Sequence, residues 1–238
     1  MGGADSREPL YYAHNWSDTN YYQGPSGAGR AVVGTVRLVG YWIDMPTSGV
    51  QKIIAGRISA AQHGWRINTG LGGASTISVV MGGSLSGWAI SPTYTVQAGD
   101  VGELFVLHAW PDLSTGVHMA IGGAEVGAGS GSAIAVTEPG AGDLLTLGRY
   151  QHAGGFGCPH IGIVSLCASP TVMTLPQIAA DASAIMSSGN KLVLPTMPGE
   201  DMRFVAFDAR PSGGDWHDRD GDNCTLSENG TVSFTAVP

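Results

Sequence analysis

The sequence predicts an all-β protein, an antiparallel β-sandwich that carries one short helix near residues 174–188. Apolar and polar residues alternate with period two in many segments, and glycine, at 37 of 238 residues, reaches about twice its usual share. Gly-rich turns separate these segments by roughly the 8–12 residues that are typical of sandwiches. Disorder is excluded, because charged residues make up only 13% of the chain and hydrophobic residues 43%.

The regular alternation of strands begins after residue 30. In residues 65–69 apolar and polar positions alternate cleanly, and residues 77–81 place their apolar side chains on one face. Residues 104–110 are apolar on both faces, which predicts a central strand that is covered on both sides. By their parity, Trp42 and Trp65 are expected in the core. Further strands are expected at residues 36–42, 117–121, 144–147, 161–167, 191–194, 204–207 and 231–237.

The helix has clear start and stop signals. Thr174 and Gln177 form a capping-box pattern around Pro176, which is favourable in a first turn. Gly189 stands where a helix-ending glycine belongs. The apolar residues that recur at helical spacing are Ile178, Ala182, Ile185 and Met186. One short helix late in an otherwise all-β chain is therefore predicted.

The two ends of the chain match no recognisable pattern. Residues 1–30 are predicted to form an N-terminal arm, and residues 31–238 a single domain with an irregular C-terminal extension from about residue 190. The arm is polar and rich in aromatic residues, such as Tyr11 and Tyr12. These side chains either pack on a neighbouring protein or cover the arm's own sandwich, and the sequence leaves both alternatives open.

Three stretches between the two ends resemble a known family. The first comprises residues 36–43, 52–56 and 64–67, the second residues 103–110 and 117–126, and the third residues 145–149 and 162–166 with the capped helix. Their order and spacing resemble the laminin-G-like members of the concanavalin A-like lectin/glucanase superfamily. The resemblance implies a jelly-roll sandwich and, by analogy of fold, a carbohydrate- or surface-binding role. Gly122 stands where the family carries an aspartate, so a side-chain ligand at that turn is lost.

Composition argues against several classes of partner. The formal net charge is −8 and Lys and Arg do not cluster, which argues against nucleic acid. No run of 18 apolar residues predicts a membrane span, and the first residues lack the apolar segment of a signal peptide. Location therefore stays open, with a virion or a cell surface as the settings considered. Three cysteines, an odd number, argue against a disulfide framework.

The sequence lacks the patterns expected of an enzyme of this fold. Glycan hydrolysis needs two neighbouring carboxyl groups, whereas Glu103, Glu125 and Glu138 are isolated. Among possible zinc ligands, Cys158 and Cys167 fit no common finger spacing with the nearby histidines, and core thiols explain them better. The chain is therefore predicted to be no enzyme.

The acidic stretch of residues 215–223 is the candidate metal site. Asp218, Asp220 and Asp222 occupy the first three ligand positions of an EF-hand loop, which makes Ca²⁺ the candidate ion. The sixth position is Asn223, where an EF-hand has glycine, and no flanking helices are evident. The alternative is a solvated acidic turn, and no cofactor is otherwise implied.

Candidate glycan contacts are aromatic residues placed at the rim of the sandwich. They are Trp88, Tyr150, His152 and Trp216, and for each of them plain packing is the alternative. Three functions follow. The leading hypothesis is a non-catalytic structural or adhesive protein of a larger assembly, such as a virion decoration or fibre protein or a surface filament. It would form homo-oligomers or bind other structural proteins through residues 1–30 and present a glycan-binding face. The alternative is a stand-alone lectin-like carbohydrate-binding module, and the third is a glycan-cleaving enzyme.

Overall fold

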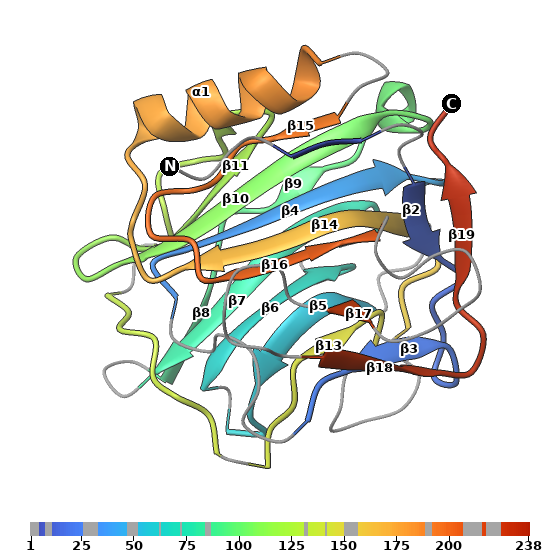
Figure 1. Cartoon of the computed structure of the whole chain (residues 1–238). Helices are drawn as coiled ribbons and strands as arrows, with labels where there is room; N and C mark the ends of the chain where they lie inside the picture. Colours follow the sequence, from blue (N-terminus) through green and yellow to red (C-terminus); the bar gives the residue numbers. More distant parts are fainter. Residues whose placement is uncertain are drawn as a thin grey trace.

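The computed structural model describes residues 5–7, 11–25, 33–46, 52–61, 63–71, 73–83, 87–130, 133–140, 142–149, 157–188, 192–206, 216–217 and 225–238. In this part of the chain, two antiparallel sheets pack face to face and one α-helix lies outside them (Figure 1). The predicted all-β jelly-roll sandwich with one short helix is therefore confirmed.

The described strands are ordered as follows. The first sheet runs β12 (Ala124–Glu125), β11 (Gly116–Ile121), β10 (Leu104–Asp112), β4 (Thr35–Trp42), β14 (Ile161–Ser169), β2 (Tyr11–His14) and β19 (Ser233–Ala236), with β16 (Met202–Val205) also paired to β14. The second runs β17 (Trp216–His217), β18 (Thr225–Asn229), β3 (Tyr21–Gln23), β13 (Thr146–Leu147), β5 (Lys52–Ile58), β6 (Gly64–Thr69), β7 (Thr76–Gly83) and β8 (Gly87–Ile90), with β9 (Tyr94–Thr95) paired to β7. A separate two-stranded ribbon joins β1 (Asp5–Arg7) to β15 (Leu192–Leu194). A short 3₁₀ turn, η1 (Ala98–Asp100), precedes β10.

The core lies between the two sheets, where the period-two alternation directs apolar side chains inward. Trp42 and Trp65 are both buried there, as predicted. The ring of Trp42 stacks on Phe105, with 4.5 Å between the ring centroids. Burying an aliphatic or aromatic side chain of this kind stabilises a fold by roughly 1.5–3 kcal/mol, so the alternating strands supply much of the driving force.

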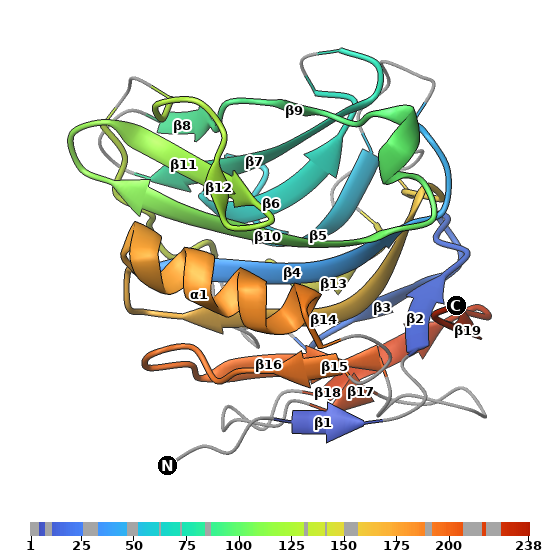
Figure 2. The same cartoon turned by 90° about the horizontal axis from the view of Figure 1, so that it is seen from above.

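The helix α1 (Leu175–Met186) begins and ends close to where its signals predict. The backbone N–H of Thr174 donates to Oε1 of Gln177 at 2.8 Å, which completes the capping box. Ile178, Ala182 and Ile185 are buried. The helix lies on the outer face of the first sheet and packs against β10 and β15 (Figures 1 and 2). This explains why β10 is apolar on both faces, because one face packs in the core between the sheets and α1 covers the other.

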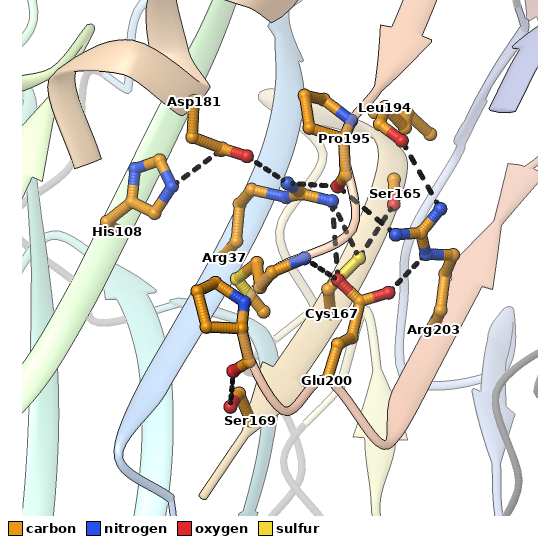
Figure 3. A network of polar contacts seen from close by, with 12 residues as sticks. Arg37, His108, Ser165, Cys167, Ser169, Asp181, Leu194, Pro195, Glu200 and Arg203 are labelled. Carbon is orange, nitrogen blue, oxygen red and sulfur yellow. Dashed lines mark hydrogen bonds and ion pairs between the residues drawn. The ribbon is translucent and has the colours of Figure 1, made fainter. Parts of the chain in front are cut away.

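Charged side chains lie between α1 and the first sheet (Figure 3). Nη1 of Arg37 donates to Oδ1 of Asp181 at 2.7 Å and to the carbonyl of Pro195 at 2.9 Å. Nε2 of His108 lies 2.9 Å from Oδ2 of Asp181. Arg203 donates to Glu200, whose other oxygen lies 3.8 Å from Arg37. These contacts join β4, β10, β16 and α1, and we call these five ionisable side chains, of which His108 is neutral, the buried network.

The described ends of the chain belong to the two sheets. β2 pairs with β14 and with β19, and β3 pairs with β13 and with β18. Tyr12, Trp16 and Tyr22 are buried, and Nε1 of Trp16 donates to the carbonyl of Ile161 at 2.9 Å. Of the two alternatives for the aromatic residues of the arm, these three therefore cover the chain's own sandwich. The division into an arm of residues 1–30 and a domain of residues 31–238 stays a prediction.

Candidate ligand-binding site

A pocket of about 490 Å³, shallow and open to solvent, lies where β3 and β18 pair. Four of the six described lining residues have polar side chains; the six are Gln23, Gly24, Pro25, Thr225, Ser227 and Asn229. The pocket is at one side of the second sheet, where the short β3 and β18 run together (Figure 1). Its volume falls within the usual range for small-ligand sites, about 300–1,000 Å³.

Strand alternation places these polar side chains on the outer face of the sheet. Tyr22 of β3 and Leu226 of β18 are fully buried in the core. Their neighbours in sequence must therefore face the other way. The register pairs Ser227 with Gln23 and Asn229 with Tyr21, so the pocket side chains stand in two adjacent rows.

An arginine and a tyrosine pack together next to the pocket lining, of which neither is part. The guanidinium carbon of Arg149 lies 4.5 Å from the ring centroid of Tyr21, in a cation–π contact. The turn after β13 sets the position of Arg149, because Oγ1 of Thr146 donates to the Arg149 carbonyl at 2.7 Å. Gly148 permits this turn: its φ is +83°, and a Cβ there would lie 2.3 Å from the ring of Trp16.

The arrangement suits a ligand with many hydroxyl groups. Within the described part of the chain, the side chains of Gln23 and Ser227 make no hydrogen bond, so their polar atoms are available to a ligand. An amide offers two donors and an acceptor, and a serine hydroxyl can donate or accept. The ring of Tyr21, half-buried and backed by Arg149, adds an apolar surface beside them. Among these described residues, no two side chains are placed to transfer a proton between them.

The glycan-binding residues that the sequence suggested are distributed differently. Trp88 is 47% exposed on β8, at the far side of the second sheet from β18, and it does not line the pocket. Trp216 belongs to β17, whose backbone pairs it with Leu226 of β18, next to the pocket. Tyr150 and His152 lie outside the described residues. The calcium candidates Asp218, Asp220 and Asp222 also lie outside them, so the Ca²⁺ hypothesis stays a prediction.

Sequence reasoning missed the pocket residues themselves. Thr225, Ser227 and Asn229 alternate with the buried Leu226, which is the period-two signal of a strand with one face to solvent. The segment is short and polar and directly follows the acidic stretch, so the sequence predicts an irregular extension there. Gln23 belongs to the arm and carries no signal by itself, because only the pairing of β3 with β18 makes it part of a site.

A second surface cluster, on the β10–β11 hairpin, superficially resembles a catalytic triad. Nδ1 of His118 lies 2.5 Å from Glu125, and Nε2 lies 2.7 Å from the hydroxyl of Thr115. The same hydroxyl donates to Asp112 at 2.9 Å. Hydrogen bonds from the Ser114 side chain and from the Ser114 and Thr115 backbones hold the pKa of Asp112 well below its usual range. The backbone donors that could stabilise an oxyanion are thus already used, and the cluster is better understood as a rigid turn.

The two described cysteines are buried, and the nearby His160 has an acidic partner. Burial raises the pKa of the Cys158 thiol to about 11, and Cys167 is likewise fully buried. His160 pairs with Asp44 in the turn before β14. Among the described residues, no group of three or more His, Cys, Asp or Glu side chains is placed to hold a metal ion. In the same residues, no helix is long and apolar enough to cross a membrane.

Known proteins resemble this chain in structure only. No family model matches the sequence, and no curated protein matches it. A "putative carbohydrate binding protein" from Bacteroides ovatus is similar in structure, with a TM-score of 0.65 and 15% sequence identity over 96% of this chain. This chain spans 60% of that protein's length. A heptameric SAP-like pentraxin from Limulus polyphemus has a TM-score of 0.51 and 12% identity, over 93% of this chain and 96% of its own. At these identities the similarity establishes a common β-sandwich fold.

Proposed function

We propose that the chain is a non-catalytic carbohydrate-binding module that holds its ligand in the pocket between β3 and β18. The observation that carries the proposal is the double row of Gln23, Ser227 and Asn229 beside the ring of Tyr21. Sugars are bound through hydrogen bonds to their hydroxyl groups and through apolar contact with their ring faces, and this surface supplies both kinds of contact.

Two further observations support the proposal by analogy of fold. The Bacteroides ovatus protein, described in its name as carbohydrate-binding, shares the sandwich over nearly the whole of this chain. The laminin-G-like pattern of residues 36–187 agrees with a binding module, and membership of that group is part of the proposal. Fold similarity alone does not determine function, so the proposal rests on the pocket.

The hypothesis of a virion or filament building block has less support. It draws in part on aromatic residues of the arm that would be free to contact a neighbouring protein. Tyr12, Trp16 and Tyr22 are instead buried in the chain's own sandwich. An assembly that presents the pocket on its surface is compatible with the proposal, but no described contact calls for one.

A glycan array with a pocket-blocking variant tests the proposal. Ser227 is exposed, so Ser227→Tyr would fill the pocket without disturbing the core. The same substitution at the exposed Ser183 of α1 is the matched control. We expect the wild type and Ser183→Tyr to bind the same glycans and Ser227→Tyr to lose more than about tenfold in affinity, or about 1.4 kcal/mol. Equal binding by Ser227→Tyr would place the site elsewhere, and absence of any glycan binding by the wild type would refute the function.

A further inference from the structure

Several arginines form ion pairs in the described part of the chain, and Arg149 differs from them. Arg37 pairs with Asp181, Arg57 pairs with Glu138 at 2.7 Å, and Arg203 pairs with Glu200. Arg149 has no acidic partner within the described residues, and its described side-chain contact is the ring of Tyr21. In a chain with 11 Lys and Arg against 19 Asp and Glu, an arginine without a carboxylate partner is unexpected.

The position of Arg149 links it to the pocket. Tyr21, which it covers, pairs in register with Asn229 of the pocket lining. The guanidinium therefore lies near the Asn229 end of the two polar rows, on the β13 side of β3 and outside the residues that line the pocket. Its Nε atom is buried and has no hydrogen-bond partner among the described residues. Stacking on a tyrosine restricts the guanidinium to one plane, so less side-chain entropy is lost when it binds a ligand.

The chemistry of a positioned guanidinium identifies the ligand class. Its planar fork matches the two oxygens of a carboxylate or a sulfate, and such charge-assisted pairs are stronger than neutral hydrogen bonds. We propose that the pocket selects anionic sugars, uronates or sulfated sugars, and that Arg149 is the residue that determines this specificity. This inference rests on the proposed carbohydrate-binding function and goes beyond it by naming the substrate class.

The overall charge makes the inference specific to one residue. A net charge of −8 repels polyanions at long range, so a general basic field cannot explain their binding. At about 0.15 M salt the screening length is about 8 Å, and only groups near the ligand contribute strongly. Any preference for an anionic sugar should then disappear when Arg149 is substituted and remain when a positively charged residue elsewhere is substituted.

Matched polymer pairs separate charge from sugar identity. Polygalacturonate and its methyl ester differ in the carboxylate, and dextran sulfate and dextran differ in the sulfate, so the two pairs distinguish the two anions. Binding is measured by titration calorimetry at about 0.15 M salt. We expect the anionic member of at least one pair to bind more than about tenfold tighter than its neutral counterpart. Arg149→Gln should bring this ratio close to one.

Lys52→Gln removes one positive charge on β5 and is the matched control, which should keep the preference. Arg149→Lys keeps the charge without the planar fork, so it should lose most of the preference and tests the same contact if Arg149→Gln does not fold. Equal binding of both members of each pair, or a preference that Arg149→Gln leaves intact, would overturn the inference while the pocket could still bind neutral sugars. Failure of all four polymers to bind would also overturn it. The glycan array then shows separately whether the proposed function stands.

Discussion

The carboxylate of Asp181 on α1 accepts hydrogen bonds from two basic side chains of the first sheet: Arg37, at 2.7 Å, and His108, at 2.9 Å. Arg37 and His108 are fully buried, and Asp181 is 7% exposed. A buried charge is tolerated only when partners replace the water that it loses. The helix that covers the sheet therefore also supplies the negative charge that the sheet's arginine requires.

Asp181→Asn should destabilise the fold strongly. The substitution keeps the shape of the side chain but removes the charge, and Arg37 is left with Glu200 at 3.8 Å as its acidic partner in the network. Breaking a buried ion pair in this way costs about 3–5 kcal/mol. Urea unfolding measures the change, with Ser183→Asn on the exposed face of the same helix as the control, expected within about 0.5 kcal/mol. Equal stability of the two variants would show that the network contributes little.

Stability should fall as the pH is lowered below about 6.5. Burial lowers the pKa of His108, more than its hydrogen bond to Asp181 raises it. Asp181 can only accept, so Nε2 carries the proton, and Nδ1 has no partner among the described residues, as expected for a neutral ring. Below pH 6.5 the unfolded chain binds a proton at this histidine that the folded chain does not, and stability is lost.

The titration of Asp181 adds a second loss of folding stability at lower pH. Burial acts to raise its pKa, but the hydrogen bond from His108 and the charge of Arg37 outweigh it, and the net shift is downward. Its contribution is complete above about pH 3.9 and disappears as the pH falls through the folded pKa.

Unfolding free energies measured at pH 7 and pH 5 separate the effect of His108 from that of Asp181. His108→Gln should lose less stability over this interval than the wild type. His63→Gln serves as the control, and an unchanged loss in His108→Gln would contradict the assignment to this residue.

Gly83→Ala should destabilise the second sheet. A Cβ at Gly83 would lie 1.5 Å from the carbonyl oxygen of Ala135, so the backbone of that segment would have to move. Forcing extra atoms into a packed site costs about 1–3 kcal/mol. At Gly99 a Cβ would have no atom within 4 Å, so Gly99→Ala is the matched control. Thermal unfolding of the two variants compares them, and similar melting temperatures would contradict the close approach.

Truncation of two tryptophans should destabilise the fold to very different extents. Trp16 is 3% exposed and hydrogen-bonded to the Ile161 carbonyl, so Trp16→Ala should cost about 3–5 kcal/mol. Trp88 is 47% exposed, and Trp88→Ala should cost about 0.5–1 kcal/mol. Chemical unfolding gives both values. A small loss for Trp16→Ala would mean that the N-terminal segment is not integrated into the sandwich.

Local patterns predicted the central strands well, because the alternation that identifies each strand lies within a few consecutive residues. The alternation in residues 65–69 and 77–81 corresponds to β6 and β7, and the double-sided apolar run of residues 104–110 corresponds to β10. The capping box at Thr174 predicted the start of α1 to the residue. In contrast, β3 has three residues and β2 has four, too few for a periodic signal.

The sequence by itself determined the fold class, the central strands and the helix, since these depend on side chains that are neighbours along the chain. Only the tertiary structure decided the pocket, because Gln23 and Ser227 are more than 200 residues apart and become neighbours solely through the pairing of β3 with β18. It also decided the partners of Arg37, which period-two alternation places on an outer face and which is buried because α1 and the segment around Pro195 cover it. Sheet pairing and helix docking are long-range choices made by the burial of the whole core, and no local stretch of residues encodes them.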